Sequence, residues 1–304
     1  MKFCSVILVA LCLFVSACQR RMALPSAVYN NIETVNARGD KMLLGHCPPY
    51  LLSQGTYKHW YDTAYLNYKP DQSIVQSISP LLKNKTIQVF LGTWCGDSRR
   101  EVPRMMKVLQ SAGMDTGHIQ LIFVSNAETA YKQSPQHEER GRNIHHIPTF
   151  IVYDKGHEMN RIVEWPVQSL EKDLLAILQR QPYTPKYKAV VYWQKNITGR
   201  NVEMSDLAIE EAAAACKPLV ASFGEFNAYG VVLFYGGNPV EALNVLRLNA
   251  LLYPQNSMAY ENLGEVYLLT DKNKAKASLE KALLLNPKSE NAMQLMKRVT
   301  EYDN

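Results

Sequence analysis

The feature that most constrains the fold is an alternation of strand-like and helix-like segments in the middle of the chain. Residues 86–94 (TIQVFLGTW) and 119–127 (IQLIFVSNA) are rich in β-branched and aromatic residues, which is typical of buried strands. Residues 97–113 between them predict a helix that stops at Gly113. The polar residues 128–144 fit either a helix or a loop.

The alternation continues with residues 149–165 (TFIVYDKGHEMNRIVEW), which predict a hairpin that turns at its DKG tripeptide. Residues 167–180 predict a closing amphipathic helix. Its apolar face carries Leu170, Leu174, Leu175 and Leu178. The complete order is β-α-β-(α)-β-β-α, which predicts an α/β domain.

A single cysteine follows the first strand, in the stretch TWCGDS. Cys95 falls at the start of the predicted helix, where unpaired N–H groups and the helix dipole favour the thiolate, the reactive form of cysteine. Ser98, one turn later, is placed to donate a hydrogen bond to this thiolate. The negative charge of Asp97 opposes the thiolate, and Arg99 and Arg100 are placed to offset it.

These residues resemble the thioredoxin family. TWCGDS matches the first part of the family's W-C-x-x-C motif through Trp94 and Cys95, and Pro103 stands where the family has the proline that kinks the active-site helix. The stretch HIPTF resembles the family's cis-proline loop, with Pro148 as the proline. The resemblance implies a thioredoxin-like domain over 84–181, in which helices flank a central mixed sheet.

The resemblance also implies roles for individual residues. In the family, the edge of the cis-proline loop pairs with the extended chain of the substrate. The implied catalytic residues are Cys95, Ser98, Trp94 and Pro148, and the implied substrate-binding residues are Ile147 and Thr149.

Two positions depart from the family pattern. Ser98 replaces the second cysteine, which releases the mixed disulfide in dithiol enzymes. Val89 stands six residues before Cys95, where thioredoxins usually carry a buried carboxylate that accepts the proton of the second thiol. A lone Cys95 can still form and shuffle a mixed disulfide, accept a small thiol as the resolving partner, or be oxidised to sulfenic acid.

The N-terminus, MKFCSVILVALCLFVSAC, has a positive Lys2 before an apolar run that is short for a membrane span, which predicts a secretory signal. The ending VSAC resembles the lipobox of bacterial lipoproteins, in which the cysteine is lipidated and cleavage falls just before it. The resemblance implies a signal peptide over 1–17, acyl chains on Cys18 that hold the protein on a membrane, and a polar tether over 18–40. A plain signal peptide or a single anchor helix is the alternative.

Three of the six cysteines then remain in an exported protein, and three thiols cannot all pair within one chain. Cys47 is a candidate resolving thiol for Cys95, because its segment could fold over the site. Cys216 lies in an alanine-rich segment, which favours packing in a core.

Residues 41–83, the segment of Cys47, predict a helical N-terminal extension. Its first helix, over 56–69, carries three tyrosines on one face, which favours core packing over an aromatic binding site. They are Tyr61, Tyr65 and Tyr68. A second short helix has Asp71 as its expected N-cap.

The last third of the chain contains an internal sequence repeat. Gly230 and Gly264 lie 34 residues apart, and Ala242 and Ala275 lie 33 apart, so each residue has its match in the second of two helix-turn-helix units. Small residues at these positions let the paired helices approach closely. The pattern resembles the tetratricopeptide repeat (TPR), which implies an all-α domain over 204–304 with a groove for a partner protein. The linker over 182–203 contains AVVYWQ, which fits a strand or a buried helix.

The formal net charge of +5 is dispersed, which argues against nucleic acid as a partner. No phosphate-binding loop, G-x-S-x-G elbow or H-E-x-x-H helix is present. His145 and His146 next to a single cysteine only weakly resemble the metal site of copper-handling thioredoxin relatives, which use two cysteines. We therefore expect no metal or cofactor.

The sequence predicts a lipid-anchored protein of the bacterial cell envelope that faces the periplasm or the cell exterior. It would act on thiols or disulfides of exported client proteins, and its TPR groove would dock a client or partner. The alternative is a non-enzymatic scaffold in which Cys95 is a relic.

Overall fold

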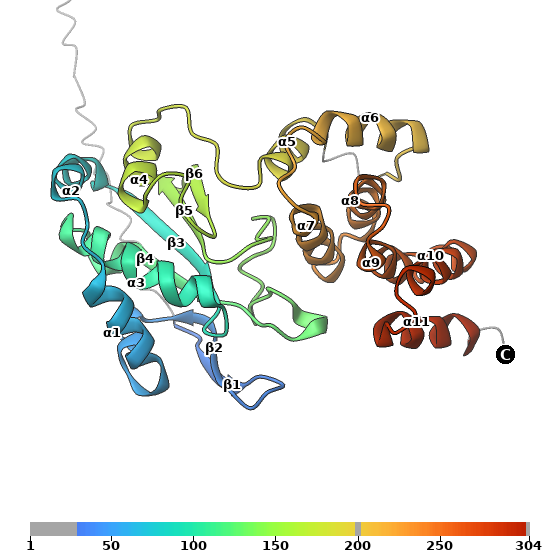
Figure 1. Cartoon of the computed structure of the whole chain (residues 1–304). Coiled ribbons are helices and arrows are strands. Elements are labelled where there is room, and N and C mark those ends of the chain that lie inside the picture. Colours follow the sequence, from blue (N-terminus) through green and yellow to red (C-terminus); the bar gives the residue numbers. More distant parts are fainter. Residues whose placement is uncertain (1–28, 198–201, 302–304) are drawn as a thin grey trace, which may run out of the picture.

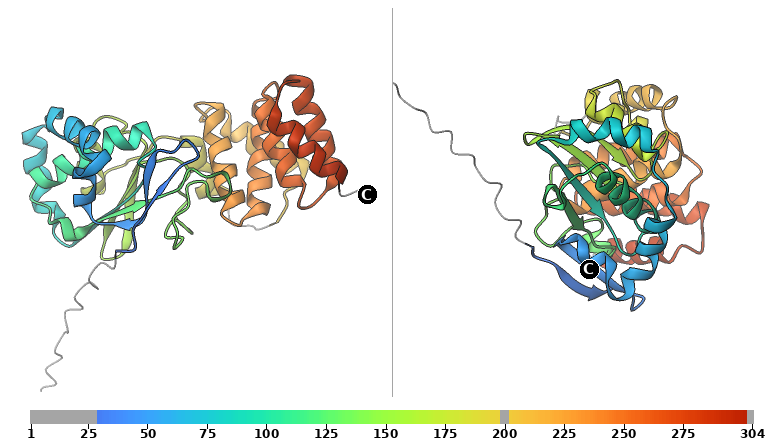
Figure 2. Two further views of the ribbon diagram at one scale, coloured as in Figure 1. Left: turned by 90° about the horizontal axis from the view of Figure 1, so that it is seen from below. Right: turned by 90° about the vertical axis from the view of Figure 1, so that its left-hand side faces the viewer.

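The computed structural model describes residues 29–197 and 202–301, which form two lobes side by side (Figures 1 and 2). The first lobe is α/β, and the second is helical. The predicted signal peptide and Cys18 lie outside the described residues. Within the described ranges, every helix is too short or too polar to span a bilayer.

Six strands form one mixed sheet in the order β1-β2-β4-β3-β5-β6. They are β1 Ile32–Val35, β2 Lys41–Cys47, β3 Lys85–Leu91, β4 Ile119–Phe123, β5 Thr149–Asp154 and β6 His157–Val163. β3 and β4 run parallel, and the other neighbours are antiparallel. The hairpin between β5 and β6 turns at Lys155 and Gly156, both at positive φ, as a two-residue hairpin loop requires. The predicted order of strands and helices is thereby confirmed.

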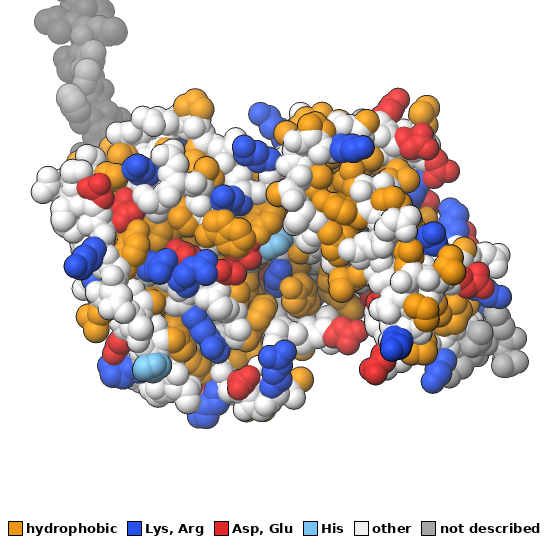
Figure 3. All heavy atoms as spheres, viewed as in Figure 1, with side chains coloured by type: hydrophobic (Ala, Val, Ile, Leu, Met, Phe, Trp, Pro, Cys, Tyr) orange, Lys and Arg blue, Asp and Glu red, His pale blue; other side chains and the backbone are white. Residues whose placement is uncertain are grey.

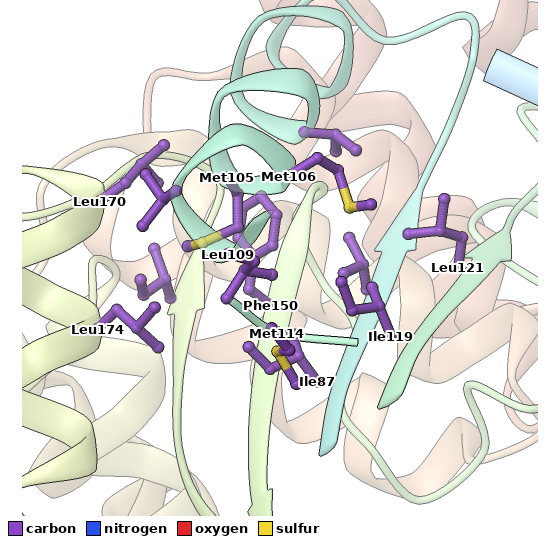
Figure 4. Close-up of a cluster of buried hydrophobic side chains, with 14 of the residues drawn as sticks. Ile87, Met105, Met106, Leu109, Met114, Ile119, Leu121, Phe150, Leu170 and Leu174 are labelled. Atoms are coloured by element: carbon purple, nitrogen blue, oxygen red, sulfur yellow. The ribbon is translucent and has the colours of Figure 1, made fainter. Parts of the chain in front are cut away.

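Four helices pack on one face of this sheet: α1 Lys58–Asn67, α2 Gln72–Ile78, α3 Gly96–Ser111 and α4 Leu170–Leu178. Figure 4 shows side chains of α3 and α4 meeting those of the strands. Alternate residues of β3 point into this core, and the intervening Phe90 is buried on the opposite face. β3 is therefore buried on both sides, as its apolar sequence predicts.

A loop, and not a helix, covers the opposite face of the sheet. Residues 124–148 contain only the short 3₁₀ turn Glu128–Ala130 as regular structure. The loop buries Val124, Ile144 and Ile147 against the sheet. This settles the choice between helix and loop left open by the sequence, and it leaves the helical lobe to pack beside the loop.

The N-terminal extension differs from the prediction. The expected tether contains β1, and the expected helical segment begins with β2, which lies between β1 and β4 in the sheet. Met42 and Leu43 of β2 are buried. Gly45 has φ +81 and lies against Asn30, where a Cβ would come within 2.8 Å of the Asn30 carbonyl oxygen. The apolar run of β2 is too short for periodicity to separate strand from helix.

The later part of the extension is helical, as predicted. Asp71 caps α2 by accepting hydrogen bonds from the N–H groups of Ser73 and Ile74. The tyrosines on the α1 face pack against the main core, which confirms their structural role. They are Tyr61, Tyr65 and, just past the helix end, Tyr68.

The helical lobe begins with the undecided AVVYWQ segment, which lies in a helix. Its helices are α5 Lys188–Asn196, α6 Asp206–Cys216, α7 Phe223–Tyr235, α8 Pro239–Leu252, α9 Ser257–Tyr267, α10 Lys272–Leu285 and α11 Glu290–Glu301. Cys216 is fully buried, which confirms its packing role.

The repeat glycines do let paired helices approach closely. A Cβ at Gly230 of α7 would lie 2.7 Å from Leu246 of α8, and one at Gly264 of α9 would lie 2.7 Å from Leu279 of α10. The two units are thus helix hairpins with a close contact at the same place. The relation to the TPR family stays a prediction.

Candidate active site

Cys95 is the N-cap residue of α3, just after the end of β3. Its backbone is extended, and its carbonyl oxygen accepts a hydrogen bond from the N–H of Arg99 at 3.0 Å. The side chain is partly exposed at the helix start. The thiol is therefore accessible and lies where the helix dipole favours its anion.

The cis-proline loop lies directly against this thiol. The Ile147–Pro148 peptide bond is cis, and the carbonyl oxygen of Ile147 lies 3.5 Å from Cys95 Sγ. The predicted juxtaposition is confirmed. Thr149 is different, because its side chain is 1% exposed and its hydroxyl donates to the His146 carbonyl at 2.6 Å. Thr149 holds the loop in shape and does not face a substrate.

Trp94 and Ser98 support the turn that carries Cys95. The indole N–H of Trp94 donates to the carbonyl of Val124 at 2.9 Å. The Ser98 hydroxyl is buried and accepts a hydrogen bond from the N–H of Gly92 at 3.2 Å. This bond uses the hydroxyl oxygen as acceptor and leaves its hydrogen free to donate, so the hydrogen bond from Ser98 to the Cys95 thiolate stays a prediction.

The two arginines near the start of α3 have different partners. Arg100 forms an ion pair with Asp97 at 2.7 Å, as predicted. Arg99 instead donates from Nε to the Thr93 carbonyl at 2.5 Å. Only one of the two arginines therefore offsets the charge of Asp97.

Comparison with protein-family models identifies the domain that carries this site. Residues 50–174 match the thioredoxin family model. These residues form a thioredoxin domain. No curated protein and no solved structure matched the chain. At the family level, the thioredoxin domain supports a thiol–disulfide redox function.

Lys132 brings a buried cation to the site of the thioredoxin domain. It lies in the loop after β4, is 5% exposed, and donates from Nζ to the His145 carbonyl. Burial lowers the pKa of Lys132 to about 8, although the charges of Glu164 and Cys95 oppose this effect. The ammonium group would therefore attract the charge of an ionised Cys95 in a region of low dielectric. A lone lysine in a polar segment offered no sequence signal.

Glu164 is a second residue that the sequence does not reveal. It follows β6, and its backbone has φ +65. Burial raises the pKa of Glu164 to about 7, the nearby charge of Asp97 adds to this rise, and Lys132 opposes it. The hydroxyl of Tyr187, from the segment before α5, donates to its carboxylate. The carboxyl group is thus held by both lobes.

A cleft of about 760 Å³ opens over Cys95, between the thioredoxin domain and the helical lobe. Figure 3 shows the surface hollowed where the two lobes meet. One wall includes Cys95, Lys132, Ile147 and Glu164, and the other is formed by residues of α7, α9 and α11.

The loop of Lys132 also contacts the helical lobe directly, because Gln133 Nε2 donates to the Tyr235 carbonyl at 2.6 Å.

The two histidines before the cis-proline join the lobes. His146 stacks on Tyr187 with ring centroids 3.8 Å apart, and His145 meets Tyr229 edge-on at 5.7 Å. Burial lowers the pKa of His146 to about 3 and that of His145 well below its usual value. Both are thus neutral packing groups.

Among the described residues, no group of three or more His, Cys, Asp or Glu side chains is arranged to hold a metal ion.

The structure does not bring Cys47 to Cys95. Cys47 is fully buried in β2, opposite Leu121 of β4, and Leu121 in turn pairs with Val89 of β3. Cys47 is therefore two strand spacings, roughly 10 Å, from Val89. Val89 in turn lies six positions before Cys95 in the chain. Burial raises the pKa of Cys47 to about 12, so its thiol is also a poor nucleophile. Cys47, Cys95 and Cys216 are all free.

Proposed function

We propose that this protein rearranges disulfide bonds of exported client proteins through the single thiol of Cys95, while Cys18 carries the lipid that tethers it to the cell envelope. The client segment occupies the cleft between the thioredoxin domain and the helical lobe. One observation carries the proposal: Cys95 Sγ lies at a helix start and beside the Ile147 carbonyl, and opens into that cleft.

The lone thiol suits exchange better than net reduction. The Cys95 thiolate attacks one sulfur of a client disulfide, a mixed disulfide forms, and the other client sulfur leaves as a thiolate. Another client thiol then attacks the client sulfur of the mixed disulfide and releases Cys95. The number of disulfides is unchanged, so the cycle needs no external oxidant or reductant and no second cysteine at Ser98.

The helical lobe supplies the second wall of the cleft. Asparagine residues of three helices of the lobe line it: Asn227 of α7, Asn262 of α9 and Asn291 of α11. Asn262 donates to Asn227 at 2.7 Å, which holds these two amides side by side. Amide groups hydrogen-bond peptide backbone of any sequence, so the lobe is suited to hold a client chain over Cys95.

Capture of clients tests this function. Cell envelopes that contain the wild-type chain are treated with an alkylating agent, solubilised and purified without reductant. We expect disulfide-linked adducts that disappear on reduction, and their complete loss in the Cys95→Ser variant, because a hydroxyl cannot form the mixed disulfide.

The matched control is Cys216→Ser, because Cys216 is buried in the helical lobe and takes no part in exchange. It should retain every adduct. Partners that co-purify equally with wild type and Cys95→Ser, without a disulfide link, would contradict the proposal and favour the scaffold alternative.

A further inference from the structure

The two exchange steps as written for Cys95 assign no role to Glu164, yet Glu164 lines the same cleft. Its main-chain N–H donates to the Pro148 carbonyl at 2.7 Å, which ties it to the cis-proline loop. Cys95 and Lys132 line this cleft together with Glu164. A residue with a carboxyl group therefore borders the space in which a client thiol must approach Cys95.

Each exchange cycle moves a proton. A client thiol must lose its proton before it attacks the mixed disulfide, and the thiolate that leaves in the other step regains one. Val89, where thioredoxins usually have the proton-accepting carboxylate, is fully buried among apolar side chains. A proton carrier of this site therefore has to come from another element than β3.

We propose that Glu164 is the proton acceptor and donor of the Cys95 site. This inference rests on the proposed disulfide exchange. In the resolving step, the Glu164 carboxylate takes the proton of the client thiol, the bond between Cys95 Sγ and the client sulfur breaks, and Cys95 leaves as a thiolate. In the next attack by Cys95, Glu164 returns this proton to the departing client thiolate. The proton is recycled, and nothing is oxidised or reduced overall.

The groups around Glu164 suit this exchange. Those that face it from the neighbouring elements are Asp97 and Arg100 of α3, Tyr131 and Lys132 of the loop after β4, and Tyr187 before α5. Burial and the charge of Asp97 raise the pKa of Glu164 to about 7, while Lys132 and Arg100 oppose the rise. Both protonation states are thus populated near neutral pH, where a group that must accept and donate a proton works best.

The test follows the resolving step alone. The full chain is converted to the mixed disulfide of Cys95 with glutathione, and release of the free protein by a single-cysteine peptide is followed by mass spectrometry between pH 5.5 and 9. For wild type we expect a rate that rises through an inflection near pH 7 and again as the peptide thiol ionises near pH 8.5. In Glu164→Gln the first inflection is lost, and the rate at pH 7 falls at least about tenfold.

Two further variants separate this role from a structural one. Asp97→Asn removes a like charge, which favours the ionised form of Glu164, so the first inflection should move below pH 7. Glu280→Gln, on the exposed side of α10, should behave as wild type. A Glu164→Gln profile that keeps the inflection near pH 7 overturns the inference alone. A wild-type mixed disulfide that the peptide cannot resolve overturns the proposed exchange and this inference with it.

Discussion

Replacement of Lys132 by methionine lowers the rate of disulfide exchange at Cys95 at pH 7 by at least about tenfold, because the site loses its buried cation. The Lys132 ammonium group is 5% exposed and interacts with the Cys95 charge. An attraction in such a dry site is much stronger than one across solvent. Methionine keeps the length and apolar stem of the side chain, so the change removes charge with little loss of packing.

The pH dependence of this effect has a defined sign. Because burial lowers the pKa of Lys132 to about 8, the cation is present below that pH and is lost above it. The ratio of wild-type to variant rates should be largest near pH 7 and should approach one above pH 9. The rates can be measured with a small aromatic disulfide whose released thiol absorbs light.

Lys172→Met, on the exposed side of α4, is the matched control and should react as wild type. A Lys132→Met rate close to that of wild type at pH 7 would show that the ammonium group does not stabilise the thiolate. A ratio that stays constant up to pH 9.5 would show that the charge of Lys132 is not the cause of the difference.

Replacement of Trp193 by alanine destabilises the helical lobe by about 3–5 kcal/mol, which is the usual cost of removing a fully buried large aromatic side chain. Trp193 of α5 is 0% exposed, and its ring lies edge-on to Phe226 of α7 at 6.1 Å. Its indole N–H donates to the Glu241 carboxylate of α8 at 2.6 Å. One side chain therefore ties α5 to both helices of the first repeat unit.

Urea unfolding followed by far-UV circular dichroism measures this loss. Trp193→Phe keeps most of the ring but not the N–H donor, so it should lose less stability than Trp193→Ala. Exchange of a small disulfide at Cys95 should survive in both variants at temperatures where the lobes stay folded. An unfolding midpoint of Trp193→Ala within error of wild type would contradict the packing described for α5.

The parts of the fold that follow from local pattern could be predicted from the sequence. The strands and helices between β3 and α4 have clear apolar patterns and stop signals, and the site motif falls at a junction between them. The cis-proline and Cys95 are 53 positions apart in the chain, and only the family resemblance, not spacing, predicted that they meet.

What the sequence could not show depends on contacts between distant elements. β2 is short, and its pairing with β1 and β4 makes it a strand. Lys132 and Glu164 are single charged residues with no motif around them, and the loop after β4 and the end of β6 bring them to Cys95. The prediction that Cys47 could resolve Cys95 rested on a helical extension folded over the site, and the strand pairing of β2 removes that premise.

The most direct test of the central claim, that Cys95 is the nucleophile of disulfide exchange, maps where a client-like disulfide attaches. The reduced full chain is mixed with one equivalent of a disulfide-linked peptide pair, quenched in acid and analysed by peptide mass spectrometry. We expect one mixed disulfide, at Cys95, with the second peptide released as a thiol. Attachment at Cys47 or Cys216, or no adduct at all, would contradict it.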